Sequence, residues 1–403
     1  MVQDKWDIIV VGGGITGLTA TALLSSLQLK VLCIEPNKPA LKQDNIAADL
    51  RSTAYLLKSV ELLKAAGVWE QLEDQAEQLK IMRICDVGGQ NETIHHENYF
   101  DSKEIDLPQF GYNIPNWFVK KTFLKKIQSL KESQIMCETK VTSIMVQMGK
   151  VIVKLSNNNL ISAKLIVAAD GRNSDIRFLS DISLKKWDNG QDALAFMVTH
   201  EKQHNNNSIE ILKTGGPCTF VPLKNTRDGE FQSAVVWMEK RQKAKSLMRL
   251  NEKDFSLALS KRTKFVLGKC NLNSRRTIYP IITQLADEFY SDRVALIGET
   301  AHVMPPIGAQ GLNTSFEDIA MLVNLIKDAL EKGTDIGSMS LLSKYGRVRR
   351  RITKSKILGI TLLNKASQAN EKITQNLRKL GLGLIKKNQF VRTSLMKIGI
   401  GKL

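Results

Sequence analysis

Apolar and polar positions near the start of the chain predict a strand, a glycine-rich turn and a helix in direct succession. Residues 6–11 are almost all apolar, Gly12 to Gly14 follow, and residues 18–27 are apolar again. A further short apolar run covers residues 30–35. Short apolar runs bounded by turn residues are typical of strands buried on both faces. The segment is therefore predicted to form a βαβ unit.

The rest of the chain shows two other patterns. Residues 150–170 predict a hairpin that leads into a buried strand, and residues 77–110 predict short strands and loops. Strict alternation of apolar and polar residues predicts strands with one buried face, which indicates an inserted antiparallel layer. The alternating runs are residues 193–200, 208–213, 217–222 and 231–238. Helices are predicted at residues 53–66, 120–131, 254–266 and 314–331, and within the Lys- and Arg-rich residues 340–403.

The glycine-rich turn has the spacing of a dinucleotide-binding motif. Gly12-x-Gly14-x-x-Gly17 stands between a predicted strand and a predicted helix, with Ile15 and Thr16 inside it. Glycines there allow a tight turn and close approach of a pyrophosphate, which the helix N-terminus also attracts. Glu35 ends the next strand, where a carboxylate accepts hydrogen bonds from ribose hydroxyls.

A second nucleotide-holding element is predicted near the other end of the sequence. The apolar run Val294 to Ile297 leads into Gly298 and Glu299, and a Pro-Pro pair, a Gly-rich turn and a helix follow. Two such elements so far apart indicate one long ligand held by both. FAD, a dinucleotide with a ribityl chain and a flat ring, fits that description.

Three further side chains are candidates for the site. Arg51 precedes a predicted helix and suits a phosphate or ribityl group, because its planar fork matches phosphate; the alternative is a solvent-facing arginine. Asp170 follows a strand at the edge where ligands bind in parallel sheets, or it caps the next helix. His302 is a candidate general base, or it packs and hydrogen-bonds locally.

The charge balance favours an anionic partner or a lysine-rich solvated surface. The chain has 58 Lys and Arg against 40 Asp and Glu, a formal net charge of +18. No nucleic-acid-binding module accompanies this charge, so an anionic membrane surface or an acidic protein complex remains as the partner. No metal ligand cluster, disulfide framework, signal peptide or membrane-spanning run is expected.

Together these motifs resemble the ubiquinone-biosynthesis hydroxylase family of FAD-dependent class A aromatic monooxygenases, which have the para-hydroxybenzoate hydroxylase fold. The segments that carry the resemblance are residues 7–17, Asp49-Leu-Arg51 with residues 62–69, residues 169–177, residues 298–313, and Tyr345 with the arginines of residues 347–351. The fold implied is α/β, a Rossmann-like FAD-binding domain with an inserted antiparallel-sheet substrate domain and C-terminal helices. The implied boundaries are residues 1–76, 111–180 and 283–339 for FAD binding, 77–110 and 181–282 for the substrate layer, and 340–403 for the helical region.

The resemblance also implies roles for single residues. Gly12, Gly14 and Gly17 would touch the pyrophosphate, Glu35 the ribose, and Val141 the adenine. Arg51, Asp170, Gly298 and Glu299 would hold the phosphate and ribityl region. The flavin ring would be lined by Pro306, Gly308, Gln310, Gly311, Leu312 and Asn313.

The activity implied is hydroxylation of the aromatic ring of a polyprenylated phenol in ubiquinone biosynthesis. FAD, reduced by NAD(P)H or another electron donor, would react with O₂ to a C4a-hydroperoxyflavin that delivers the oxygen. The lipid-like substrate would lie between the flavin and the inserted sheet, in a protein of the bacterial cytoplasm or peripheral on the inner membrane. Residues 357–363 and 380–385, apolar and flanked by lysines, suit an interfacial helix; a packed helix with a charged face is the alternative.

Three departures from the family pattern keep other interpretations open. Glu299 stands where the ribityl carboxylate is usually Asp, Gly308-Ala309 replaces the Ala-Gly order of ubiquinone hydroxylases, and Thr314-Ser315 replace an apolar-Gly pair. The alternatives are a reductase or halogenase of the same fold, although the Trp-x-Trp-x-Ile signature of halogenases is absent. A flavin-poor scaffold subunit of a quinone-biosynthesis complex is the third interpretation.

Overall fold

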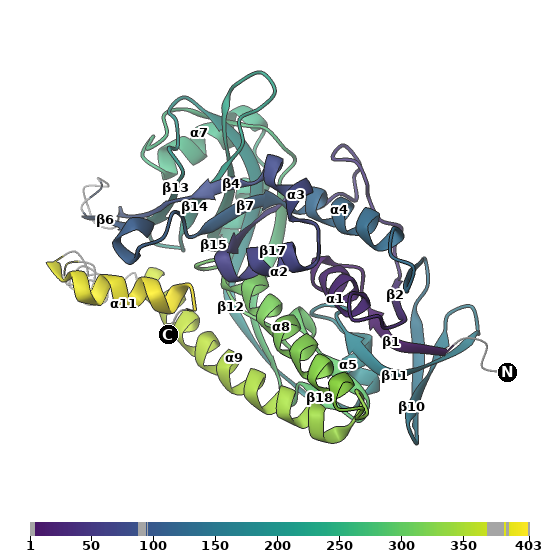
Figure 1. Cartoon of the computed structure of the whole chain (residues 1–403). Helices are drawn as coiled ribbons and strands as arrows, with labels where there is room; N and C mark the ends of the chain where they lie inside the picture. Colours follow the sequence, from purple (N-terminus) through teal and green to yellow (C-terminus); the bar gives the residue numbers. More distant parts are fainter. Residues whose placement is uncertain (1–4, 88–93, 95, 369–382, 384–386, 402–403) are drawn as a thin grey trace.

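In a computed structural model of the chain, three β-sheets are arranged with helices between and around them (Figure 1). The structure describes residues 5–87, 94, 96–368, 383 and 387–401. We call the sheets A, B and C, with eight, three and nine strands respectively.

Sheet A contains the predicted βαβ unit. Its central strand β1 (Lys5–Val11) pairs in parallel with β2 (Val31–Glu35) and with β11 (Leu160–Ala168). The order across the sheet is β18-β19-β11-β1-β2-β8, and β10 and β9 continue from β11 as an antiparallel extension. The other strands are β8 (Ser133–Cys137), β9 (Val141–Gln147), β10 (Lys150–Leu155), β18 (Tyr290–Ser291) and β19 (Val294–Leu296).

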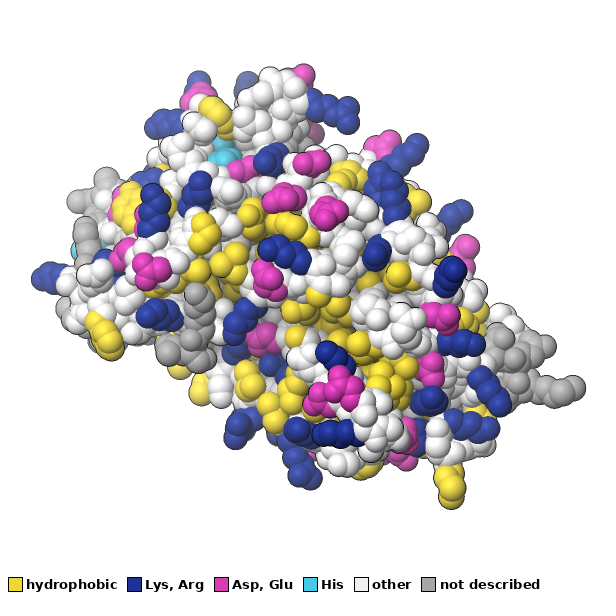
Figure 2. Space-filling view, in the orientation of Figure 1, with side chains coloured by type: hydrophobic (Ala, Val, Ile, Leu, Met, Phe, Trp, Pro, Cys, Tyr) yellow, Lys and Arg dark blue, Asp and Glu magenta, His cyan; other side chains and the backbone are white. Residues whose placement is uncertain are grey.

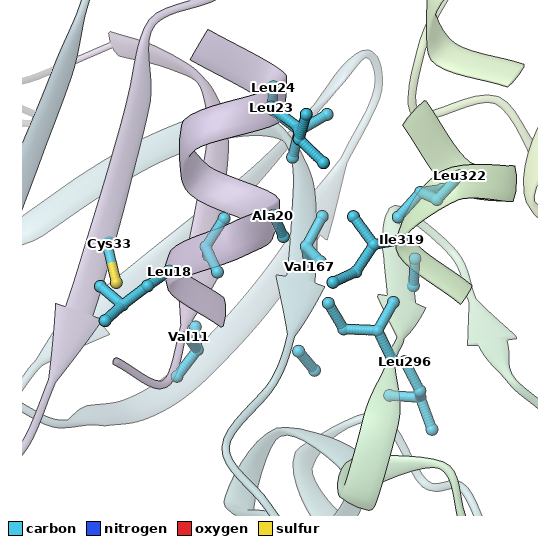
Figure 3. Packing of buried hydrophobic residues seen from close by; sticks show 14 of the residues in the cluster. Val11, Leu18, Ala20, Leu23, Leu24, Cys33, Val167, Leu296, Ile319 and Leu322 are labelled. Carbon is cyan, nitrogen blue, oxygen red and sulfur yellow. The ribbon is translucent and has the colours of Figure 1, made fainter. Parts of the chain in front are cut away.

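The main core lies where two helices pack on sheet A. Helix α1 (Ile15–Ser25) follows the glycine-rich turn, and α8 (Gln310–Glu331) follows the second predicted element. Figure 3 shows Ile319 of α8 facing Val167 of β11, with Leu296 of β19 beside them. These side chains are at most 1% exposed, so the two ends of the sequence share one core.

Sheet C contains the inserted layer. Its order is β20-β17-β12-β15-β14-β13-β5-β6, with β16 beside β12. Most pairs are antiparallel as predicted, but β13 pairs in parallel with β5. Its strands are β5 (Ile81–Asp86), β6 (His96–Asp101), β12 (Leu184–His200), β13 (Asn207–Leu212), β14 (Cys218–Leu223), β15 (Phe231–Lys240), β16 (Cys270–Leu272), β17 (Thr277–Ala286) and β20 (His302–Val303).

One face of sheet C is covered by two helices, α6 (Arg241–Met248) and α7 (Glu252–Arg262). Ile209, Ile211 and Phe220 of the sheet form a fully buried cluster with Phe255 and Leu259 of α7. Side chains alternate across a strand, so their sequence neighbours point to the opposite face. We call that opposite face the inner face.

Sheet B corrects one sequence prediction. It consists of β3 (Ser52–Leu56), β4 (Glu77–Leu79) and β7 (Gly111–Pro115). The helix predicted from residue 53 is wrong for its first turn, because residues 53–56 pair with β7 and α2 (Leu57–Ala65) begins only afterwards. Apolar residues at 56 and 60 fit a helix, but Thr53 and Tyr55 belong to residue types that favour strands.

Two helices follow α8 in the described part of the chain. Helix α9 (Met339–Ser367) packs along α8, and α11 (Gln389–Gly399) lies beside β6 and the turn that follows it (Figure 1). None of the described helices is long and apolar enough to cross a membrane. The remaining helices are α3 (Trp69–Leu72), α4 (Asn116–Gln128) and α5 (Asp175–Leu179), with 3₁₀ turns η1 (Glu73–Gln75), η2 (Ser102–Ile105) and η3 (Gly298–Thr300).

Candidate functional site

The glycine-rich turn holds its shape through two glycines and leaves the third open. A side chain at Gly12, whose φ is +111°, would meet Ala169 O at 2.3 Å, and one at Gly17 would meet Gly12 O at 1.9 Å. A Cβ at Gly14, the N-cap of α1, would have no atom within 4 Å, and no side chain caps the helix there. The N-terminus of α1 therefore faces open space, where its N–H groups and dipole favour an anion.

Glu35 lies directly beside this turn. Its Oε2 accepts a hydrogen bond from Gly13 N at 2.6 Å, and its Oε1 accepts from the backbone and side chain of Asn37. Val141 begins β9 close by, two residues after Thr139, whose N–H donates to Glu35 O. A carboxylate has about four acceptor positions, so Glu35 keeps capacity for a further donor.

Arg51 lies in a cluster of charged groups around Tyr279. Its Nε and Nη2 each donate to Asp49 at 2.8 Å, and its guanidinium lies 5.8 Å from the centre of the Tyr279 ring. Burial acts to raise the pKa of Asp49, but the bonds and charge of Arg51 outweigh it and lower that pKa. Burial raises the pKa of Tyr279, which Arg51, Arg172 and Glu299 also influence, so all of these groups lie near one another.

Glu299 is paired within this cluster. Its Oε2 accepts from Arg172 Nε at 3.2 Å, while its side chain stays half exposed. The sequence prediction included Glu299 but assigned no role to Arg172 or Tyr279. The motif after Asp170 contained the signal for Arg172, whereas Tyr279 lies on a strand whose position only the tertiary structure reveals.

Asp170 both caps a helix and joins the two predicted elements. Its Oδ2 accepts from Ile176 N at the start of α5, and its Oδ1 accepts from the Thr300 hydroxyl at 3.1 Å. Thr300 Oγ1 in turn accepts from Gly171 N. Asp170 therefore supports the first turn of α5, whose N-cap residue is Ser174, and it lies at the strand edge beside the second element, where ligand binding stays a prediction.

Gly298 is the point where the two nucleotide elements meet. Its φ is +62°, and an added Cβ would lie 3.0 Å from Thr16 Cγ2 and 3.2 Å from Ser315 Oγ. Its N–H donates to Asp318 Oδ2 at 3.0 Å. The start of α1, the end of β19 and α8 are thus fixed against one another.

His302 belongs to a buried network and does not face the open side of the site. Its Nε2 lies 2.7 Å from Asp318 Oδ2, and its ring stacks on Phe289. Asp318 also accepts from Arg349 Nε at 2.7 Å, and all three charged or polar side chains are at most 5% exposed. This geometry supports local packing and hydrogen bonding of His302, because the buried imidazole is engaged with Asp318, and the general-base role stays a prediction. The sequence prediction missed Asp318.

The turn after the Pro-Pro pair is open, while the residue at its end is fully bonded. Pro306 and Gly308 are exposed, and Gly308 and Ala309 have φ values of +62° and +55°. Gly311 has open space where a Cβ would be, and Leu312 packs on the core. Asn313 instead bonds Leu56 N, Ser59 Oγ, Ala54 O and Ala309 O. Its side-chain amide therefore holds the turn in place. Oδ1 already accepts two hydrogen bonds and Nδ2 already donates two, so neither atom is left for a ligand.

The segment from Glu299 to Gln310 has contacts at both edges of the inner face of sheet C. Glu299 lies near Tyr279 at one edge. Gln310 Nε2 donates to Gly399 O of α11 at 3.0 Å, and Met396 and Ile400 pack on Ile84 and its neighbours at the other edge. The inner face is mainly apolar: Ala193, Met197 and Met238 on it are buried, whereas Met82, Ile84, Val221 and Val236 are of intermediate exposure.

These features define a class of protein. A strand, glycine turn and helix with a carboxylate on the next strand, joined to a second glycine turn, form the binding region of a dinucleotide-dependent oxidoreductase. The open Gly14, the uncapped α1 and the spare acceptor capacity of Glu35 fit FAD. No group of three or more His, Cys, Asp or Glu side chains that could hold a metal ion occurs among the described residues.

The comparison with known proteins identifies the family. Residues 5–357 match the FAD binding domain family, and the chain belongs to this family. The resemblance to ubiquinone hydroxylases is confirmed by relatives of nearly full length. "Ubiquinone hydroxylase UbiL" of Rhodospirillum rubrum is 28% identical over 400 residues, which cover 98% of this chain and 90% of the relative. "3-demethoxyubiquinol 3-hydroxylase" of Escherichia coli is 24% identical over 403 residues and covers 100% of both.

The fold is confirmed by solved structures. The p-nitrophenol 4-monooxygenase PnpA from Pseudomonas putida superimposes with a TM-score of 0.79 at 17% identity, covering 98% of this chain and 97% of its own. The α/β fold with a Rossmann-like FAD-binding region and an inserted sheet is therefore the fold of an FAD-dependent monooxygenase.

Proposed function

We propose that this protein is an FAD-dependent monooxygenase that hydroxylates the aromatic ring of a polyprenylated phenol in ubiquinone biosynthesis. The observation that carries the proposal is the group of partly exposed apolar side chains on the inner face of sheet C, Met82, Ile84, Val221 and Val236, with the second FAD element at the edges of that face. A lipid-like ring substrate needs an apolar surface next to the flavin. The names of the full-length relatives support the same substrate class.

Different residues of the site would bind different parts of the cofactor. Gly12, Gly14 and the N-terminus of α1 would hold the pyrophosphate, with Glu35 on the ribose and Val141 near the adenine. Arg51 and Glu299 would hold the phosphate and ribityl region, and the exposed turn at Pro306 and Gly308 would lie along the ring. Bound FAD would supply the oxygen-activating chemistry, with electrons from NAD(P)H or another donor.

The chain's own contribution to the reaction is positioning and exclusion of water. The inner face would hold the ring by apolar contact, and α11 would close one edge of that surface through Met396 and Ile400. The paired charges of Arg51 and Asp49 would remain fixed while substrate enters.

A direct experiment tests this function. Purified protein should show flavin absorbance near ~450 nm and should consume NAD(P)H faster when a short-chain prenyl phenol is added. Mass spectrometry should then find the phenol with one added oxygen. A colourless protein that takes up no FAD on reconstitution would support the scaffold interpretation and contradict the enzyme.

We further propose that the protein contacts an anionic membrane surface through the second half of α9. Leu358, Leu362 and Leu363 are 63%, 59% and 60% exposed, with Lys354 and Lys365 exposed beside them. Figure 2 shows Lys and Arg side chains along the edge formed by α9, with hydrophobic side chains between them. Exposed apolar side chains flanked by cations suit the boundary between lipid headgroups and acyl chains.

The other predicted interfacial segment is residues 380–385. All of these residues except residue 383 lie outside the described residues.

An acidic protein complex is the alternative partner for the surface of α9. Vesicle binding would distinguish a membrane from such a complex.

A further inference from the structure

A carboxylate, that of Glu210, points to the inner face of sheet C from β13, the third strand from the β6 edge. Glu210 lies on β13 between Ile209 and Ile211, both of which pack in the cluster with α7. Its side chain therefore points to the inner face, where its register partners are Ile84 on β5 and Thr219 on β14. Only 8% of Glu210 is exposed.

Glu210 has no partner within the described part of the chain. Its carboxylate makes none of the hydrogen bonds or ion pairs found there, and burial alone raises its pKa to about 7. Burying a carboxyl group without a partner costs free energy. The contacts within the fold therefore give no reason for an acid at this position.

The surroundings of Glu210 are mainly apolar, with Thr219 on β14 and Asn98 on β6 as the uncharged polar side chains of the neighbouring strands. Ile84, Val221 and Val236 are partly exposed side chains of the same face, and Ser208 on the same strand already donates to Phe220 O. The other titratable groups on this face lie towards its edges. They are Asp86 on β5, His96 on β6, Tyr279 on β17, and the Arg392–Glu104 pair between α11 and η2.

We propose that Glu210 binds a hydroxyl group on the aromatic ring of the substrate and accepts its hydrogen bond. This inference rests on the proposed function and assigns the polar contact of the same site. A carboxylate without a partner on a mainly apolar surface selects a ligand that is apolar except for a hydrogen-bond donor, which describes a prenylated phenol or quinol. A ring whose hydroxyl is methylated offers no donor and would be rejected, because the carboxylate stays buried and unpaired.

The same contact gives a route for the hydroxyl proton. When it moves, the phenol O–H bond breaks, a carboxyl O–H bond forms on Glu210, and the electron pair stays on the phenolate oxygen. The ring then becomes more electron-rich and a better target for oxygen transfer. Burial raises the pKa of Glu210 to about 7. This value is closer to the pKa of a phenol, about 10, than the pKa of an ordinary carboxylate is, so proton transfer is less unfavourable.

The test compares two ligands on the FAD-loaded holoenzyme by titration calorimetry. The ligands are 2-geranylphenol and its methyl ether, and the variants are Glu210→Leu and Glu210→Gln, with Ser208→Ala as the control on the same strand and face. The wild type should bind the phenol about tenfold or more tightly than the ether, as expected for a hydrogen bond to a charged group. Glu210→Leu should bind both ligands equally, and Ser208→Ala should keep the preference.

Turnover gives a second readout. Glu210→Gln preserves shape and hydrogen bonding but accepts no proton, so it should keep most of the phenol affinity and lose kcat. A Glu210→Leu protein that retains the wild-type preference for the phenol would overturn the inference. Loss of that preference in Ser208→Ala as well would also overturn the assignment to Glu210.

Failure of this inference can be distinguished from failure of the proposed function. Wild-type protein that binds FAD but adds oxygen to no prenylated phenol would refute the hydroxylase, whatever the two ligands' affinities. Hydroxylation that proceeds equally in wild type, Glu210→Leu and Glu210→Gln would leave the hydroxylase standing and refute the role of Glu210.

Discussion

Asp318 and His302 form a buried pair, with His302 Nε2 2.7 Å from Asp318 Oδ2. The same carboxylate oxygen accepts from Gly298 N, and the other accepts from Arg349. Asp318 thus fixes the glycine at which the two nucleotide elements meet.

Replacing Asp318 with Asn should destabilise the protein strongly. The change leaves Arg349 buried with its charge less well paired, which typically costs about 3–5 kcal/mol. His302 and Arg349 outweigh burial and lower the pKa of Asp318. Asp318 therefore stabilises the folded protein at pH values above the ordinary pKa of an aspartate, and this stabilisation is lost as the pH falls below that pKa. Denaturant unfolding at several pH values would measure this, with exposed Asp328→Asn on the same helix as the control; equal loss in both variants would contradict the prediction.

The Gly308–Ala309 order offers a matched pair of substitutions. Both residues have positive φ, +62° and +55°, and such a conformation costs a non-glycine residue roughly 1–2 kcal/mol. Ala309→Gly should therefore raise the free energy of unfolding by about 1 kcal/mol, and Gly308→Ala should lower it by a similar amount. The midpoint of denaturant unfolding reports both, and two shifts of the same sign would refute the strain argument.

Arg51→Ala should weaken FAD binding. Its guanidinium is held by Asp49 at the edge of the site, and loss of a charged hydrogen bond corresponds to about tenfold or more in Kd. Arg51→Lys should recover only part of the affinity, because an ammonium group cannot make the bidentate contact. Fluorescence titration of apoprotein with FAD measures the effect, and Arg347→Ala, an exposed arginine on α9, should bind FAD as the wild type does.

Glu210→Gln should make the protein more stable above neutral pH. Burial raises the pKa of Glu210 from 4.5 to about 7, so the charged form is disfavoured in the folded state. Stability is unaffected below about pH 4.5, falls as pH rises from there to about 7, and then levels off, a loss of roughly 3 kcal/mol. The variant's gain should thus appear in thermal unfolding at pH 8 and vanish at pH 4; a gain of equal size at both values would show that charge is not its cause.

Replacing Leu358, Leu362 and Leu363 together with Ser should reduce binding to vesicles of phosphatidylglycerol. Each exposed leucine that enters the lipid interface contributes on the order of 1 kcal/mol, so the apparent affinity should fall about tenfold or more. Binding should also weaken with salt, and phosphatidylcholine vesicles should bind poorly. Leu330→Ser, an exposed leucine on α8, is the control; unchanged sedimentation of the triple variant would exclude this surface as the membrane contact.

The sequence predicted those parts of the site that depend on local patterns. The strand, glycine turn and helix around Gly14 are set by residues next to one another, and so is the turn at Gly308. Apolar periodicity also predicted the βαβ unit and the inserted antiparallel layer, because it records which elements are buried, while the complete fold was implied by the family resemblance.

Features that depend on tertiary pairing were not predicted. Asp318 meets Arg349 across 31 residues, and Tyr279 reaches Arg51 from a distant strand. The parallel pairing of β13 with β5 joins segments more than a hundred residues apart. The sequence places the charged Glu210 between two isoleucines. Alternation of apolar and polar residues alone suggested that the face of the strand with Glu210 was open to water.

The position of α11 has a practical consequence for work on the purified protein. Gly399 O accepts from Gln310, and Lys58 Nζ donates to Gly401 O, so the end of this helix lies against the exposed turn at Gly308. An affinity tag or fluorescent label fused beyond Gly401 would begin beside this turn, and we expect it to alter the measured binding of cofactor and substrate. Fusions ahead of β1, which lies at the opposite side of the molecule from α11 (Figure 1), are the appropriate ones for the titrations described above.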